Sequence, residues 1–260
     1  MSVHACSKAS VEEVPLLKGM KTTLKTGWLG GPAIALYRAG YKLVRTVSGN
    51  DQRLLENHLA REQFKKLQIG TGLRPLDGWL NSDFFPKSKQ LVHVDATKTF
   101  PFKDQTFDFV YCEHMIEHIP YDLGHFMLNE FFRVLKVGGK VRIATPDLAF
   151  LISLYRIDKS ELQEEYIKQK SEYCKAPFCC DTFVINNFVR DWGHTFIYDE
   201  KTLRFSMEKA GFSKITRCDL NASEDATLQN IANESRSSKG FLDLETFTLE
   251  GTKQAASSQR

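Results

Sequence analysis

The sequence lacks the features that mark membrane or secreted proteins. No stretch approaches the ~20 apolar residues of a membrane-spanning helix. Residues 1–10 hold no apolar core of a signal peptide. The cysteines show no paired Cys-x-x-Cys spacing, which disfavours a zinc framework; they are Cys6, Cys112, Cys174, Cys179, Cys180 and Cys218. We therefore expect a cytoplasmic protein with reduced thiols.

The chain also lacks a large charge excess. Its net charge of +3 is too small to indicate nucleic acid as a partner. The excess is concentrated at the start, where residues 1–66 hold eleven Lys and Arg against five Asp and Glu. A helix is predicted from Pro32, with a basic stripe beside an apolar one. We expect residues 1–60 to form a helical extension, either packed on the main domain or acting as a lid or membrane-surface element.

From Lys66 onward, short apolar runs alternate with helical patterns. Strands are predicted at Lys66–Gly70, Trp79–Asp83, Gln90–Val94, Phe107–Tyr111, Lys140–Thr145, Ile215–Leu220 and Glu245–Gly251. Helices are predicted at Asp51–Lys65, Leu123–Leu135, Leu148–Lys170 and Lys201–Ala210, with irregular structure over 171–195. This alternation predicts an α/β domain over residues 61–253, with a mostly parallel sheet and a flexible tail at 254–260.

Two glycines end the first predicted strand. Gly70 and Gly72 allow backbone to approach a ligand closely at the carboxyl edge of the sheet. Only Thr71–Gly78 separates the first two strands, whereas a full crossover needs about a dozen residues. The first crossover is therefore shortened, which disfavours a phosphate bound at a helix N-terminus and a nicotinamide cofactor.

Acidic residues follow the next two strands. Asp83 ends the second strand, where a carboxylate can accept both ribose hydroxyls of a nucleoside. Asp95 and Ala96 follow the third strand, where carboxylate and backbone can bracket an adenine. An exposed loop acid is the alternative interpretation of either carboxylate. Together with the glycines, these residues predict a nucleoside-containing ligand without a bound phosphate.

Five segments then occur in a characteristic order. They are Ile69–Gly72, Trp79–Asp83, Phe100–Asp108, Glu113–His118 and Arg133–Lys140. Over about residues 65–251 the chain resembles the class I S-adenosylmethionine-dependent methyltransferases of the methyltransferase-domain (type 11-like) group. The resemblance implies a Rossmann-like seven-stranded sheet with helices on both faces and an antiparallel last strand. It also implies a cofactor site made by Gly70, Thr71, Gly72, Arg74, Asp83, Asp95, Ala96 and Glu113.

The sequence departs from that family at two places in the first loop. Thr71 stands where many members have an acidic residue or Cys, and the third glycine is missing, with Arg74 just beyond. Arg74 either pairs with the carboxylate of the cofactor or is simply solvated.

The segment from His114 to His118 matches the pattern His-x-x-Glu-His, which binds zinc in some metalloproteases. Its place after a buried strand disfavours a protease. It is more similar to small-RNA and ubiquinone-pathway O-methyltransferases, which bind a metal there; their ligand positions correspond to His114, Glu117, His118 and His194. His in place of the first Glu favours Zn²⁺ or Fe²⁺ over Mg²⁺. We expect the first three on one helical face, converging with His194 either as a divalent metal site or as a metal-free base cluster.

These observations predict an enzyme that methylates an O, N or S nucleophile of a small hydroxylated metabolite or sugar. Residues 146–195 and the N-terminal helix are expected to cover the substrate. A non-catalytic S-adenosylmethionine- or nucleoside-binding module acting through partners is the alternative, and a nicotinamide oxidoreductase is the third. Neither a nucleic acid partner nor a membrane span is expected; the sequence leaves the oligomeric state open.

Overall fold

The computed structural model describes residues 40, 44–45 and 47–255, and it divides the chain into the units Met1–Gly49 and Asn50–Arg260. The helix predicted from Pro32, most of the predicted extension and the last five residues of the tail lie outside the described residues. The second unit holds the whole sheet. In the described part of the chain, no helix combines the length and the apolar character that crossing a membrane requires.

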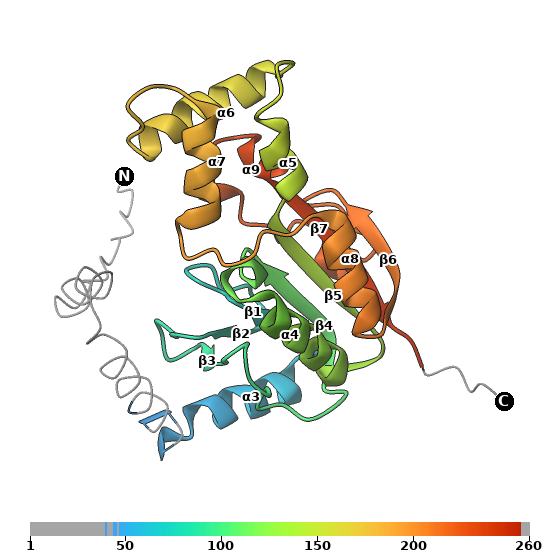
Figure 1. Ribbon diagram of the computed structural model, residues 1–260. Helices are drawn as coiled ribbons and strands as arrows, with labels where there is room; N and C mark the ends of the chain where they lie inside the picture. Colours follow the sequence, from blue (N-terminus) through green and yellow to red (C-terminus); the bar gives the residue numbers. More distant parts are fainter. Residues whose placement is uncertain (1–39, 41–43, 46, 256–260) are drawn as a thin grey trace, which may run out of the picture. The chain divides into compact units, whose positions relative to one another are not determined.

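Seven strands form one sheet in the order β3-β2-β1-β4-β5-β7-β6 (Figure 1). Their bounds are β1 Lys66–Ile69, β2 Leu80–Asp83, β3 Val92–His93, β4 Phe107–Glu113, β5 Leu135–Pro146, β6 Phe212–Cys218 and β7 Thr246–Lys253. Strands β1 to β5 pair in parallel, and β7 is antiparallel to both of its neighbours. The Rossmann-like fold class with an antiparallel last strand is confirmed.

All seven predicted strands form, with bounds that differ from the predictions by up to five residues. Strand β3 shrinks to two residues. Strand β5 begins at Leu135, five residues earlier than predicted, and includes Gly138 and Gly139. Position 139 needs a glycine because the neighbouring strand is close. A Cβ on Gly139 would lie 3.0 Å from the backbone oxygen of Asp108.

The helices and 3-10 turns frame the sheet. They are α3 Asn50–Arg61, η1 Ile116–His118, α4 Tyr121–Val134, α5 Leu148–Ser153, α6 Glu161–Tyr173, α7 Asp181–Arg190, α8 Glu200–Lys209, η2 Ala226–Leu228, η3 Glu234–Arg236 and α9 Phe241–Glu245. The shortened first crossover is confirmed, because no helix lies between β1 and β2.

The helical region predicted over Leu148–Lys170 is confirmed, but one other prediction is wrong. That region forms two helices, α5 and α6, and Ser160 caps the second in a capping box with Gln163. The region 171–195 is not irregular, because it contains α7, whose Val184 and Phe188 are buried at helical spacing. The sequence contains this helical spacing of apolar residues, although cysteines and polar residues surround it.

The two faces of the sheet are covered differently. Helices α3, α4 and α8 pack on one face around the main core, which includes Phe107, Phe131 and Met207. The opposite face is covered by the long connection between β6 and β7, where Leu228 packs on Trp79 and Tyr111. The same connection reaches the carboxyl end of β4, where the Asn233 amide donates to Glu113 at 2.8 Å.

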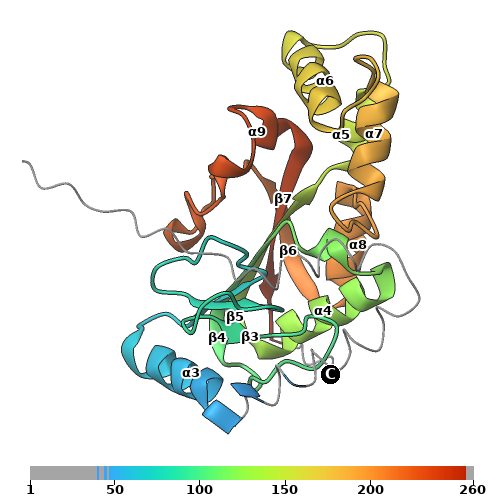
Figure 2. The same cartoon turned by 90° about the vertical axis from the view of Figure 1, so that its left-hand side faces the viewer.

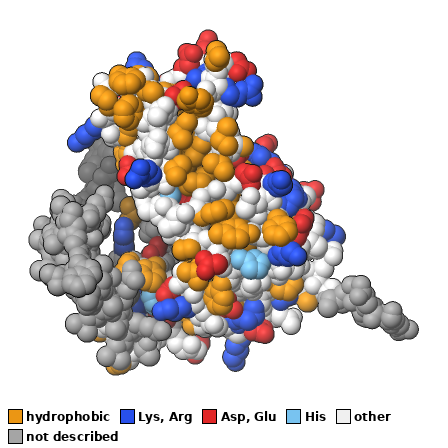
Figure 3. Space-filling view, viewed as in Figure 1, with side chains coloured by type: hydrophobic (Ala, Val, Ile, Leu, Met, Phe, Trp, Pro, Cys, Tyr) orange, Lys and Arg blue, Asp and Glu red, His pale blue; other side chains and the backbone are white. Residues whose placement is uncertain are grey.

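Helices α5, α6, α7 and α9, here called the cap, gather at one end of the sheet (Figures 1 and 2). Strand β5 leads into α5, and α9 leads into β7, so the cap lies beyond the carboxyl end of β5. It has its own small core, which includes Phe150, Tyr166, Phe188 and Phe241. Hydrophobic side chains also remain on the outer surface around α6 and α7 (Figure 3); they include Tyr173, Phe178, Phe183 and Val189.

Candidate functional site

The site begins where β4 ends beside β5. Glu113 pairs with Ala144, and the chain then turns at His114, whose φ of +47° lies in the left-handed region. A single 3-10 turn, η1, follows before α4 begins. The prediction that His114, Glu117 and His118 share a helical face is therefore wrong, because a left-handed residue cannot continue a right-handed helix.

Glu117 is the centre of the site and is fully buried. Its Oε2 accepts a hydrogen bond from Thr145 Oγ1 at 3.1 Å. Its Oε1 has no hydrogen-bond partner among the described residues, and lies 3.5 Å from His114 Nδ1 and 3.9 Å from His118 Nε2. Burial raises the pKa of Glu117, but the neighbouring imidazoles, His114 first, outweigh it and hold the pKa below its ordinary value. Glu117 is thus ionised although it is buried.

His114 connects the cluster to β7. One ring nitrogen, Nδ1, faces Glu117, and the other, Nε2, lies 2.8 Å from Thr246 Oγ1. Nε2 is therefore engaged by Thr246, whereas Nδ1 lies near Glu117 Oε1 without a hydrogen bond to it.

His194 reaches the cluster from a loop held by backbone contacts. Trp192 and Gly193 both have positive φ, +58° and +82°, and the next amides, those of Thr195 and Phe196, donate to the Glu117 carbonyl at 2.8 and 3.2 Å. The ring centroids of His118 and His194 then lie 4.9 Å apart. The structure thus brings all four predicted residues together.

The surroundings of His194 determine which of its nitrogens is free. Nδ1 lies 2.6 Å from the Phe188 carbonyl oxygen, which can only accept, so Nδ1 carries the proton and Nε2 keeps its lone pair. Burial holds the pKa of His194 below its ordinary value, which favours the neutral ring. One ligand atom each from Glu117, His118 and His194 lie within 4.8 Å of one another, which suits a metal ion or a shared proton.

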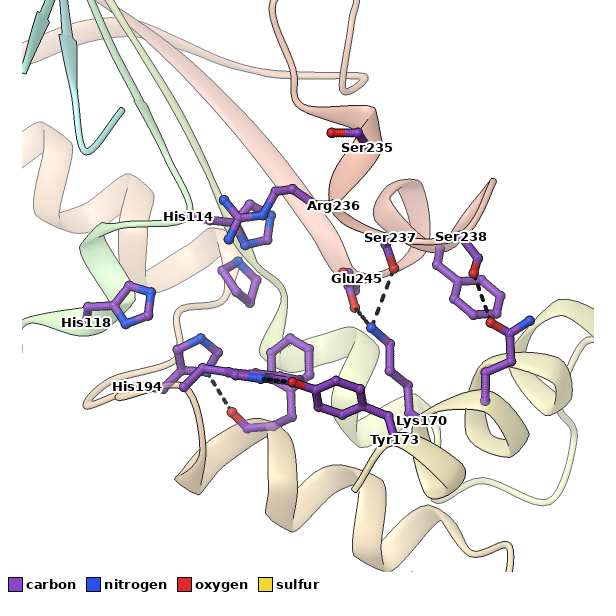
Figure 4. Close-up of a pocket in the computed structure, with 15 residues that line it drawn as sticks. His114, His118, Lys170, Tyr173, His194, Ser235, Arg236, Ser237, Ser238 and Glu245 are labelled. Atoms are coloured by element: carbon purple, nitrogen blue, oxygen red, sulfur yellow. Dashed lines mark hydrogen bonds and ion pairs between the residues drawn. The ribbon is translucent and has the colours of Figure 1, made fainter. Parts of the chain in front are cut away.

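A cavity of about 650 Å³ opens beside this cluster (Figure 4). His114, His118 and His194 form one wall. The cap and the β6–β7 connection form the rest, with Lys170, Tyr173, Trp192, Arg236 and Glu245 among the lining residues. Lys170, Tyr173 and Trp192 fall within residues 146–195, which the sequence analysis expected to cover the substrate, whereas Arg236 and Glu245 were missed. The available signal was the length of the β6–β7 connection, since long connections are often functional.

The predicted cofactor residues lie at the ends of β1 and β2. Gly70 and Gly72 have φ of +75° and +59°. Asp83 accepts from the Gly72 amide through Oδ2 and from the Phe85 amide through Oδ1, each at 2.9 Å. No heavy atom lies within 4 Å of a Cβ built on Gly72, and the buried Thr71 hydroxyl has no hydrogen-bond partner among the described residues. These residues fit a nucleoside ligand at this edge.

Other members of the predicted cofactor set already have protein partners. A Cβ on Gly70 would lie 2.6 Å from Met115 Cγ, so its close approach is to a side chain. Asp95 accepts from Thr97 Oγ1 at 2.6 Å and lies 3.4 Å from Lys98 Nζ, next to the buried Ala96.

Arg74 and Glu113 hold the β6–β7 connection. The Arg74 guanidinium donates to the Ala232 carbonyl, and Glu113 Oε1 accepts from the Asn233 amide at 2.8 Å. The interpretation of Arg74 as simply solvated is therefore wrong, because its guanidinium donates to a backbone carbonyl of the β6–β7 connection.

Comparison with known proteins relates part of this chain to a protein family. Residues 43–143 match the family model described as the methyltransferase domain. This confirms the resemblance to class I methyltransferases seen in the sequence, and this family implies S-adenosylmethionine as cofactor. No curated protein matches the chain.

Several solved structures are similar to this chain at low identity. An S-adenosylmethionine-dependent methyltransferase from Thermotoga maritima shares 16% identity, covering 85% of this chain and 99% of that one, with a TM-score of 0.43. One from Archaeoglobus fulgidus also shares 16%, covering 82% and 99%, with a TM-score of 0.44. Haemonchus contortus phosphoethanolamine N-methyltransferase 2 shares 14%, covering 79% and 52%, with a TM-score of 0.39. Such distant likeness carries no argument about the substrate.

Proposed function

Because this chain carries a methyltransferase domain, we propose that it transfers a methyl group from S-adenosylmethionine to an O, N or S nucleophile of a small hydroxylated metabolite or sugar. The observation that carries the proposal is the cavity beside the Glu117 cluster. It adjoins the carboxyl ends of β4 and β5, the edge where ligands bind in open α/β sheets.

The ends of β1 and β2 supply the cofactor side. S-adenosylmethionine supplies an electrophilic methyl group. Both oxygens of Asp83 accept loop amides and each keeps a second lone pair, so the carboxylate is oriented and still able to accept ribose hydroxyls. Gly72 leaves room for backbone to approach the ligand, and Asp95 follows β3 where the adenine is expected.

The cavity supplies the acceptor side. Its volume of about 650 Å³ lies within the ordinary range for small-molecule sites. Tyr173 and Trp192 line it with aromatic surface, and the Trp192 Nε1 donates to the Tyr173 hydroxyl at 3.1 Å, which holds the two rings. Aromatic faces and the hydroxyls of Ser235 and Ser237 suit a compact, hydroxylated acceptor.

The Glu117 cluster supplies activation of the acceptor. Methyl transfer is an in-line displacement, so most of the rate comes from alignment and the rest from withdrawing the proton of the nucleophile. Glu117, His118 and His194 present a carboxylate and two imidazoles within 4.8 Å. We propose that they hold one divalent transition metal, Zn²⁺ or Fe²⁺, leaving at least one position open toward the cavity.

Two features support the metal. The Nδ1 hydrogen bond of His194 to Phe188 leaves Nε2 as the ligand atom, as ligating imidazoles commonly require. The buried Oε1 of Glu117 has no hydrogen-bond partner among the described residues and would gain one bond from a metal ion. In metal-free protein, the same Nε2 of His194 is the base that accepts the proton.

Calorimetry and a labelled-cofactor assay test the function. Full-length protein is titrated with S-adenosylmethionine, its demethylated product and NAD. We expect the first two to bind and NAD to fail. The protein is then incubated with methyl-labelled cofactor and a metabolite extract, where a labelled hydroxylated product supports the proposal. Cofactor binding with no labelled product from any extract favours the non-catalytic binding module instead.

A further inference from the structure

One cation of the cavity wall, Arg236, has no side-chain partner among the described residues. Lys170 is paired, since its Nζ lies 3.6 Å from Glu245 Oε2 and 3.5 Å from Ser237 Oγ. Arg236 also lines the cavity, and its side chain reaches from the β6–β7 connection toward the cavity interior (Figure 4). In the part of the chain that the structure describes, the Arg236 guanidinium makes no ion pair and no hydrogen bond. The cavity therefore offers one unneutralised positive charge.

The segment that carries Arg236 is held at both ends. On the sheet side, Arg74 donates to the Ala232 carbonyl, and the Asn233 amide donates to Glu113. On the cap side, Ser238 Oγ donates to Gln169 Oε1 at 2.9 Å, and Phe241 is buried in the cap core. Four anchors over ten residues place the backbone of Arg236 in the wall of the cavity. Its position is thus determined by the fold, unlike that of an arginine on a free loop.

The acidic side chain among the lining residues, Glu245, does not pair with Arg236. Glu245 is already engaged, because Tyr166 donates to its Oε2 at 2.6 Å and Lys170 lies beside the same oxygen. A guanidinium has a planar fork of donors that matches the two oxygens of a carboxylate or phosphate.

We propose that the methyl acceptor carries an oxyanion, a phosphate or a carboxylate, which Arg236 binds while the nucleophile faces His118 and His194. This inference rests on the proposed function and narrows its substrate class from hydroxylated metabolites to sugar phosphates or sugar acids. A hexose with one such group is of a size suited to a cavity of about 650 Å³.

Three matched sugars test the inference. Full-length protein is titrated calorimetrically with glucose 6-phosphate, glucuronate and glucose, at low and at physiological salt. We expect at least one anionic sugar to bind about tenfold or more tightly than glucose, as a charged hydrogen-bonded pair provides, and to weaken with salt. The anionic sugar that binds more tightly shows whether the acceptor carries a phosphate or a carboxylate.

Arg236→Gln and Lys239→Gln form a matched pair of variants. Both remove one exposed positive charge from the same segment, but Lys239 does not line the cavity. We expect Arg236→Gln to abolish the preference for the anionic sugar and Lys239→Gln to keep it. The inference is overturned if neither anionic sugar binds more tightly than glucose, or if Arg236→Gln keeps the preference. S-adenosylmethionine titrated into the same samples separates the two proposals, since its failure to bind contradicts the proposed function and not the oxyanion site.

Discussion

The rings of His118 and His194 lie with their centroids 4.9 Å apart, although 75 residues separate them in the chain. The amides of Thr195 and Phe196 hold this arrangement by donating to the Glu117 carbonyl. The loop before α8 is thereby bound to the 3-10 turn after β4. Two imidazoles and one buried carboxylate meet only because this contact forms.

The metal proposal predicts that His118→Ala weakens Zn²⁺ binding by more than about 100-fold, beyond the roughly 10- to 100-fold cost of losing an outer-shell partner. Equilibrium dialysis with Zn²⁺ and the visible spectrum of Co²⁺-loaded protein measure this. His125→Ala, on α4 and outside the metal-ligand group, is the control and should bind one equivalent. Metal-free protein that keeps full activity in chelator would instead leave His194 as a base.

The cofactor proposal predicts that Asp83→Ala weakens S-adenosylmethionine binding by about 1.5–3 kcal/mol, the range for hydrogen bonds to a charged group. The structure adds a second effect, because the amides of Gly72 and Phe85 lose their acceptor and the loop loosens. Calorimetry gives the affinity and thermal unfolding gives the stability. The exposed Asp77→Ala is the control and should change neither quantity. Unchanged cofactor affinity in Asp83→Ala would reject its role.

The two loop glycines are predicted to differ when replaced by alanine. Both have positive φ, which costs about 1–2 kcal/mol for a residue with a Cβ. Gly70→Ala also places its Cβ 2.6 Å from Met115 Cγ, whereas Gly72→Ala meets open space. Urea unfolding should therefore show the larger loss for Gly70→Ala. Calorimetry should show reduced cofactor affinity for Gly72→Ala, and equal stability of the two variants would contradict the packing described for Met115.

Glu130 gives a prediction for acid stability. Burial raises its pKa, but hydrogen bonds from Arg133 and from the Phe100 amide outweigh burial and hold the pKa below its ordinary value. A lowered folded-state pKa means that the stabilisation is complete above the unfolded pKa of about 4.3 and is lost as the pH falls through the folded-state value.

Glu130→Gln should lower the free energy of unfolding at pH 7 by about 1–3 kcal/mol. Urea unfolding from pH 7 down to pH 3 should show the difference from the unmodified protein shrinking with acid. Asp104→Asn is the control, because its exposed carboxylate pairs with the same Arg133 and is screened by water. A difference that stays constant with pH would show that packing, not charge, accounts for the loss.

Two truncations test whether the domain begins at residue 61, as the sequence predicts, or before α3. Deleting residues 1–49 should leave a folded chain that binds S-adenosylmethionine, because the predicted cofactor and cluster residues lie beyond them. Deleting residues 1–61 also removes α3, whose Leu54 and Leu55 pack on the main core and whose His58 Nε2 accepts from the Lys66 amide. We expect the second chain to unfold at lower urea. Equal stability of both chains would support the boundary at residue 61 over one before α3.

The sequence by itself determined the strands, the short first crossover and the two loop glycines. These features depend on local chemistry: alternating apolar runs, the number of residues between Gly70 and Trp79, and backbone angles that glycine adopts readily. The ordered motifs then indicated a resemblance to a family, and the resemblance implied the antiparallel position of β7, which no local pattern of that strand indicates.

The tertiary structure alone decided how the site is assembled. His114 adopts a left-handed conformation because β4 must turn sharply where it pairs with β5, and helical periodicity contains no information about that turn. Arg236 enters the cavity wall because the nearby Ala232 and Asn233 are hydrogen-bonded to Arg74 and Glu113, more than 100 residues away in the chain. Contacts at such distances follow from the packing of the connection on the sheet. For that physical reason, the candidate cluster and the cover over residues 146–195 were predictable from the sequence, whereas the part of the wall formed by the β6–β7 connection was not.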